Sequence, residues 1–125
     1  MLVRYASRTG EVKVLGTRDD LHHLASLVKA GRGEVPCCED NTPGPYNKTL
    51  STVTIFNTPG RNVVLSVTDR GTLLIDGDMT KLSVFAKNIS GFAEAAGAQE
   101  HMHVEYFPGH FYLGPESAPV VFAFT

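Results

Sequence analysis

The sequence predicts an α+β fold, a mostly antiparallel sheet of about six to seven strands with two helices packed on one face. Three observations favour this class. Most runs rich in β-branched residues are separated by short polar links, whereas a parallel crossover needs about a dozen residues or more. Apolar residues recur at helical spacing in only two segments, residues 17–30 and 78–96. The length of 125 residues and the hydrophobic share of 42% suit a single globular domain over residues 1–125.

The chain begins with a predicted hairpin and a predicted helix. Residues 2–5 and 12–15 are β-rich runs around a polar turn, which is typical of two paired strands. Thr17 can cap a helix, with Asp20 as an acidic variant of the capping box. Apolar residues then recur at helical spacing up to Gly31, and glycine commonly ends helices.

Residues 31–48 are rich in glycine and proline and predict a long loop. A loop of this length in a small domain is often functional, and the alternative is a surface crossing with no role. The loop contains Cys37 and Cys38. Adjacent cysteines exclude a disulfide framework, and they lack the Cys-x-x-Cys spacing typical of metal sites. We interpret them as two ordinary thiols, with a reactive thiol as the alternative.

Five further strands are expected. Residues 52–56, 62–67 and 72–76 are extended runs joined by short turns that contain Pro-Gly and Asp-Arg-Gly. Consecutive strands on short links most simply form an antiparallel meander. The last two strands are expected at residues 101–107 and 120–124, with a loop between them.

The second predicted helix lies between the meander and the last two strands. Asp78 or Thr80 can cap it, and apolar residues recur near one face from Leu82 to Ala96. Gly97 can end it. An apolar stripe of this kind is more typical of core packing than of a cofactor site.

Charge and hydropathy argue against two classes of partner. With 11 Lys and Arg against 13 Asp and Glu, the net charge is −2. The chain has no basic run, so nucleic-acid binding through phosphate neutralisation is not expected. No apolar stretch approaches the roughly 20 residues of a membrane helix, and the start shows no secretory signal. We therefore expect no nucleic-acid or membrane partner and a cytoplasmic location.

One predicted strand carries metal-ligand side-chain types on a single face. Because side chains alternate along a strand, His101, His103 and Glu105 share a face. Imidazole and carboxylate groups bind zinc and non-haem iron, and His110 could supply a fourth ligand. A metal-dependent enzyme is therefore one hypothesis. A polar face open to solvent or to a partner explains the same alternation and is the interpretation we favour, so we assign no catalytic residue, metal or cofactor.

Three segments of the C-terminal half form a combination of motifs. Residues 73–78 read Leu-Leu-Ile-Asp-Gly-Asp, residues 101–106 read His-Met-His-Val-Glu-Tyr, and residues 109–122 run from Gly-His-Phe-Tyr-Leu into the last strand. Together they resemble the immunity protein 32 family of bacterial polymorphic toxin systems, in which a His-x-His strand precedes a Tyr-Leu…Ser-x-Pro loop. The resemblance covers roughly residues 71–125.

The resemblance implies a small cytoplasmic protein that binds and neutralises a cognate toxin, with no turnover of its own. Binding of this kind uses a preformed surface with a few aromatic and charged anchors. For Phe111, one candidate anchor, we favour packing inside the protein. A third hypothesis is a structural or ligand-binding subunit that forms a homodimer through an exposed sheet. The expected contact residues are His101, His103, Glu105, Tyr106, Phe107, His110 and Tyr112, with Glu34, Glu39 and Asp40 facing a basic toxin surface.

Overall fold

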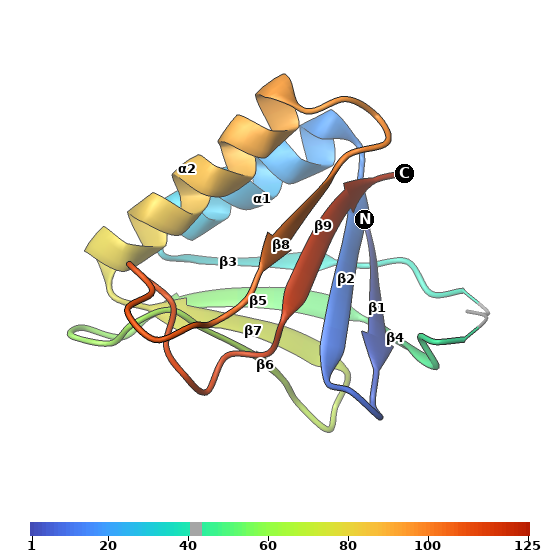
Figure 1. The fold of residues 1–125 in the computed structure, drawn as a ribbon, viewed down its shortest axis with the longest axis horizontal. Coiled ribbons are helices and arrows are strands. Elements are labelled where there is room, and N and C mark those ends of the chain that lie inside the picture. Colours follow the sequence, from blue (N-terminus) through green and yellow to red (C-terminus); the bar gives the residue numbers. More distant parts are fainter. Residues whose placement is uncertain (41–43) are drawn as a thin grey trace.

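The structure is a computed structural model that describes residues 1–40 and 44–125 (Figure 1). Over these residues the chain forms two helices and nine strands. The predicted α+β class is confirmed. The strands are more numerous than expected, and they form two sheets instead of one. One short strand within the predicted loop and one that begins at its last residue pair at sheet edges, which accounts for the higher strand count.

The helices are α1 (Arg18–Ala30) and α2 (Met79–Ala95). The strands are β1 (Leu2–Ala6), β2 (Glu11–Gly16), β3 (Arg32–Pro36), β4 (Lys48–Leu50), β5 (Thr52–Asn57), β6 (Val64–Val67), β7 (Thr72–Gly77), β8 (His101–Val104) and β9 (Val120–Phe124). The large sheet has the order β4-β1-β2-β9-β8, and the small sheet has the order β3-β5-β7-β6.

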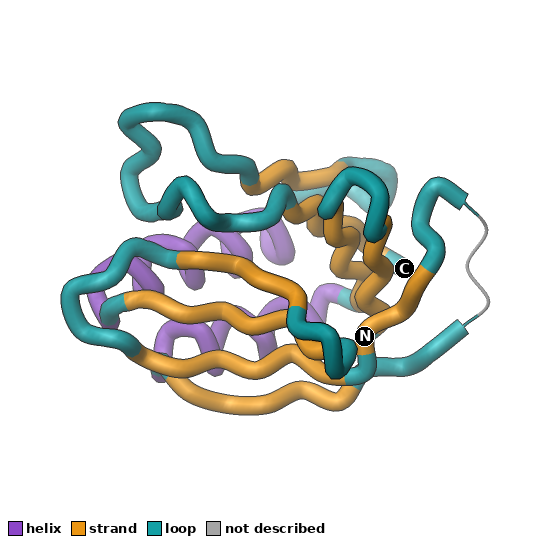
Figure 2. The backbone as a smooth tube through the Cα atoms, turned by 90° about the horizontal axis from the view of Figure 1, so that it is seen from below, coloured by secondary structure: helices purple, strands orange, loops and turns teal. Residues whose placement is uncertain are grey.

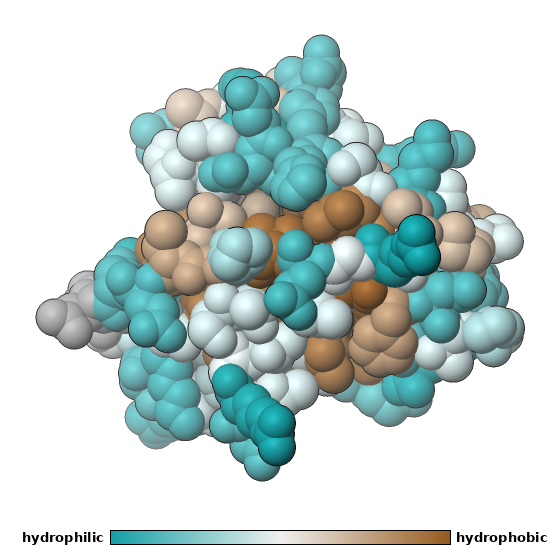
Figure 3. Space-filling model, turned by 180° about the vertical axis from the view of Figure 1, so that it is seen from behind, coloured by the Kyte–Doolittle hydropathy of each residue, from teal (hydrophilic) through white to brown (hydrophobic). Residues whose placement is uncertain are grey.

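The two helices lie side by side over one face of the small sheet, and the large sheet stands beside them (Figures 1 and 2). Seen from below, the strands of the small sheet lie in front of the helices, and no helix covers their other face (Figure 2). Seen from behind, the upper part of the molecule, over the helices, is mainly hydrophilic (Figure 3). In the part of the chain that is described, neither helix is long and apolar enough to cross a membrane.

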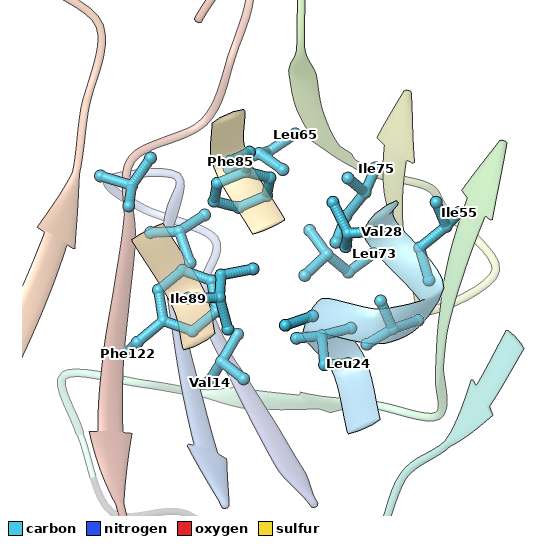
Figure 4. Close-up of a cluster of buried hydrophobic side chains, with 14 of the residues drawn as sticks. Val14, Leu24, Val28, Ile55, Leu65, Leu73, Ile75, Phe85, Ile89 and Phe122 are labelled. Carbon is cyan, nitrogen blue, oxygen red and sulfur yellow. The ribbon is translucent and has the colours of Figure 1, made fainter. Parts of the chain in front are cut away.

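A cluster of buried apolar side chains joins the helices to both sheets (Figure 4). Phe85 and Ile89 of α2 and Phe122 of β9 are at most 1% exposed, as are Leu73 and Ile75 of β7. The rings of Phe85 and Phe122 meet edge to face, with centroids 6.0 Å apart. Because α2 contributes to the contacts with each sheet, it fixes the sheets relative to one another.

Both helices begin where the sequence predicts. Thr17 caps α1, and its side chain and that of Asp20 form the two reciprocal hydrogen bonds of a capping box. Gly31 ends α1 in the left-handed conformation, with φ of 74°. Asp78 caps α2 through the backbone N–H of Lys81. These ends were predictable because each depends on side chains within a few residues of it.

The small sheet differs from the predicted meander. β7 lies between β5 and β6, parallel to β5 and antiparallel to β6. The link between β5 and β6 is long enough to cross two strand spacings of about 4.8 Å each. The central position suits β7 because Leu73, Ile75 and Asp76 are all buried. Asp76 accepts a hydrogen bond from Thr58 at 2.6 Å, which satisfies part of this buried carboxylate.

The predicted loop over residues 31–48 is interrupted by β3, an edge strand antiparallel to β5. Val35 of β3 is 8% exposed and belongs to the core. Pro36 is tolerated because it ends an edge strand. Residues 41–43 of the predicted loop lie outside the described residues.

The large sheet confirms the predicted β1–β2 hairpin. β9 pairs with β2 in parallel and with β8 in antiparallel orientation. β8 ends at Val104 and not at residue 107 as expected. Glu105 therefore lies beyond the strand that carries His101 and His103.

Arg18 connects the start of α1 to the end of α2 and to the last strand. Its guanidinium donates hydrogen bonds to the carbonyl oxygens of Ala93 at 2.6 Å and Ala96 at 2.7 Å. The same guanidinium lies 4.6 Å from the ring centroid of Phe124, which stacks on Phe92. A cation at the carboxyl end of a helix also interacts favourably with the helix dipole.

Replacing Arg18 with alanine should lower the free energy of unfolding by about 1–3 kcal/mol, because two charge-assisted hydrogen bonds and a cation–π contact are lost together. Arg18→Lys should recover only part of this loss, since an ammonium lacks the planar fork. Urea unfolding measures both variants. Arg8→Ala, in the exposed β1–β2 turn, is the control, and an equally small effect of Arg18→Ala would contradict the assignment.

Candidate functional site

The segment between β8 and β9, residues 105–119, is fixed to the small sheet, and we call it the aromatic loop. Leu113 forms a β-bridge with Val63, next to β6. Further along, the hydroxyl of Ser117 accepts a hydrogen bond from the backbone N–H of Leu65 at 3.0 Å. The backbone N–H of Ala118 donates to the carbonyl oxygen of Leu65 at 2.7 Å. The loop is therefore a preformed surface that connects the two sheets.

His110 holds the turn of the aromatic loop. Its Nδ1 accepts hydrogen bonds from the backbone N–H groups of Tyr112 at 3.3 Å and Leu113 at 3.0 Å. Its ring lies 4.8 Å from that of Phe107 and 4.7 Å from that of Tyr112, between centroids. Burial lowers the pKa of His110 from its usual 6.5. An Nδ1 that accepts hydrogen bonds must be unprotonated, so the geometry requires the neutral ring.

Tyr112 belongs to the core, and its expected role as a surface anchor is wrong. Its side chain is 4% exposed and stacks on Phe85 with a centroid distance of 5.5 Å. Its hydroxyl accepts a hydrogen bond from the Asn88 amide at 3.0 Å. Burial raises the pKa of Tyr112. Tyr112 therefore anchors the aromatic loop to α2 from the inside.

Phe111, which we expected to pack inside, points outward and is 71% exposed. Lys81 of α2 donates a hydrogen bond from Nζ to the carbonyl oxygen of Phe111 at 2.9 Å, and this Nζ lies 5.1 Å from the ring centroid. Phe107 is 58% exposed, while Tyr106 is half-buried against the core. The aromatic loop therefore presents two phenyl rings to the outside. A loop has no periodicity, so the sequence held no signal that distinguishes Phe111 from Tyr112.

The histidines of β8 lie on the large sheet. His101 and His103 are exposed on the same face of this edge strand. His103 and Glu105 line a shallow hollow of about 300 Å³ together with Glu11 of β2. Within residues 1–40 and 44–125, no group of three His, Cys, Asp or Glu side chains could hold a metal ion. The set His101, His103, Glu105 and His110 is therefore not brought together as a metal centre.

The three acidic residues predicted to face a toxin have different surroundings. Glu34 is exposed on β3 of the small sheet. Asp40 accepts a hydrogen bond at 3.0 Å from Arg4, which belongs to the large sheet. Glu39 is exposed and precedes Asp40. The charge of Asp40 is thus partly offset inside the protein.

Both cysteines are free thiols. Cys37 is half-buried, and burial raises the pKa of its thiol. A raised pKa keeps the thiol protonated and lowers its nucleophilicity. Cys38 is exposed next to it.

The comparison with known families bears on the part of the chain that carries the aromatic loop. Residues 72–125 match the model of a family described as immunity protein 32. The matched segment begins with β7 and includes α2, β8, the aromatic loop and β9. It agrees with the resemblance predicted for roughly residues 71–125. No curated protein and no solved structure matches the chain.

The protein should lose stability as the pH falls, because the pKa of His110 is lower in the folded chain than its ordinary value of 6.5. Between those two values the unfolded chain binds the proton more readily, so the contribution of His110 is present above about pH 6.5 and is lost below it. His110→Asn keeps an acceptor near Nδ1 but does not titrate, so its stability should fall less steeply. Urea unfolding at several pH values measures both slopes.

The control for this experiment is His101→Asn, which removes an exposed imidazole from β8. We expect this variant to keep the pH dependence of the wild type. Identical slopes for the wild type and His110→Asn would contradict the proposed role of His110.

Proposed function

We propose that this protein is an immunity protein, which binds a cognate toxin in the cytoplasm and neutralises it without turnover. The observation that carries this proposal is the match of residues 72–125 to the immunity protein 32 family. The matched segment contains the aromatic loop, whose two exposed phenyl rings are not explained by the needs of the fold. An inhibitor of this kind needs a surface for tight association and does not need a catalytic pocket.

The aromatic loop has the physical properties of a binding anchor. Phe107 and Phe111 are 58% and 71% exposed, so each can bury a large apolar area in a complex. His110 and Tyr112 hold the loop from within, through two backbone hydrogen bonds and a ring stack. A preformed loop loses little conformational entropy on binding, which favours tight association.

We expect a toxin domain to be encoded beside the gene for this chain, at the C-terminus of a large secreted protein, and the direct test uses that domain. Expressed alone, this domain should stop growth, and co-expression of the full chain should restore it. The purified pair should form a stoichiometric complex on size-exclusion chromatography. A toxic domain that neither binds the chain nor is relieved by it would contradict the proposal.

The double variant Phe107→Ala/Phe111→Ala should weaken binding of the toxin domain by roughly thirty-fold or more, the effect of losing about 2 kcal/mol at central aromatic anchors. Titration calorimetry measures the affinity. Phe56→Ala removes a ring that is 39% exposed on β5, outside the matched segment, and serves as the control.

A second comparison separates the loop from the sheet face. His101→Ala/His103→Ala removes the two imidazoles of β8 and leaves the aromatic loop intact. If this variant loses affinity and the phenylalanine variant does not, the contact surface is the large sheet and not the loop.

A further inference from the structure

A groove runs along the outer side of the helix pair, between α1 and α2. It has two neighbouring hollows of about 240 Å³ and 470 Å³, and both are lined by Lys29 of α1 and Lys87 of α2. The floor of the smaller hollow includes Ala25 and Ala86, which are nearly buried. Small side chains at these positions leave space between the helices, while the two lysines stand at the rim.

The charge of the groove is positive at its centre. In the described parts of the chain, neither Lys29 nor Lys87 has an ion-pair or hydrogen-bond partner for its ammonium group. No acidic side chain lines either hollow. Glu94 lines neither hollow, and its carboxylate lies 3.2 Å from Nε2 of His22, which lines the smaller hollow. The chain as a whole carries a net charge of −2, so this local charge is opposite in sign to the total.

The groove adjoins the aromatic loop across α2. Met79, at the start of α2, lines the larger hollow and is 42% exposed. Two residues further on, Lys81 bonds to Phe111 of the loop. α2 therefore contacts Phe111 of the aromatic loop through Lys81 and lines the groove through Met79 and Lys87.

We infer that the groove receives an acidic segment of the toxin, with a carboxylate of Asp or Glu bound between Lys29 and Lys87. This inference rests on the proposed function and adds the chemistry of the partner. The observation that supports it is charge complementarity: two adjacent ammonium groups without partners, above a floor of small side chains. Carboxylate oxygens accept charge-assisted hydrogen bonds from ammonium groups. A toxin segment that covers the open groove excludes water, which strengthens these bonds.

The inference predicts which step of binding depends on the lysines. Charges of opposite sign steer diffusional encounter, so they act mainly on the association rate and their effect decreases with salt. The phenyl rings of the aromatic loop act mainly on dissociation, because apolar burial is complete only in the final complex. The two parts of the surface can therefore be separated kinetically.

The test compares Lys29→Gln/Lys87→Gln with the control Lys13→Gln/Lys48→Gln, which removes the same charge from β2 and β4 of the large sheet. Association with the purified toxin domain is measured by stopped-flow at low and high ionic strength. The groove variant should associate about ten-fold more slowly at low salt, and the difference should disappear at high salt. The control should match the wild type, and equal rates for the two double variants would overturn the inference.

A measurement on the wild-type complex avoids any effect of substitution on folding. A zero-length carbodiimide joins an ammonium group to a carboxylate in contact with it. Mass spectrometry should find Lys29 or Lys87 joined to an Asp or Glu of the toxin domain. Cross-links only at other lysines would overturn the inference while leaving the proposed function intact, whereas a toxin domain that does not bind the wild type at all contradicts the proposed function itself.

Discussion

The packing of Phe85 determines how the other parts of the structure lie. This fully buried ring of α2 contacts Phe122 of the large sheet edge to face and stacks on Tyr112 of the aromatic loop. One side chain thus joins a helix, a sheet and the loop that follows β8. Because interiors are close-packed, none of the three can shift without opening a cavity. The position of the aromatic loop is therefore a consequence of core packing and does not require a partner.

The same packing determines which side chains of the aromatic loop point inward and which point outward. Tyr112 and Leu113 point inward, at 4% and 1% exposure, and His110 turns the chain by accepting their backbone N–H groups. Phe111 precedes this pair and is left outside, where Lys81 lies against its ring. A phenyl ring that stays in water does not contribute the roughly 2 kcal/mol of folding free energy that its burial would provide. A loop that is rigid and still exposes Phe107 and Phe111 is suited to binding.

The sequence predicts those parts of the fold that depend on near neighbours. The capping box of Thr17 and Asp20, the stop at Gly31 and the cap at Asp78 were all found, because the interacting groups are three or four residues apart. The order of β5, β6 and β7 in the small sheet was predicted wrongly. The central position goes to the strand whose side chains are most buried, and that burial depends on residues distant in the sequence. β3 was missed because its glycine and proline content hides an edge strand that only β5 stabilises. For the candidate site, Phe107 and His110 were named as contact residues from the family resemblance, and their role in binding stays a prediction. The burial of Tyr112 and the exposure of Phe111 could not be predicted, because burial inside a loop has no sequence period.

The segment that matches the immunity protein 32 family does not form its sheets alone. β7 pairs on both sides with strands outside the match, β5 and β6, and β9 pairs with β2. Without these partners the backbone groups of β7 would lose their hydrogen bonds and its buried side chains would lose their cover. Residues 1–71 must therefore supply strands that pair with the matched segment and apolar side chains that cover it. Many different apolar sequences can meet these two requirements. A binding loop needs particular side chains at particular places. A similarity confined to residues 72–125 is thus compatible with a fold that extends over the whole described chain.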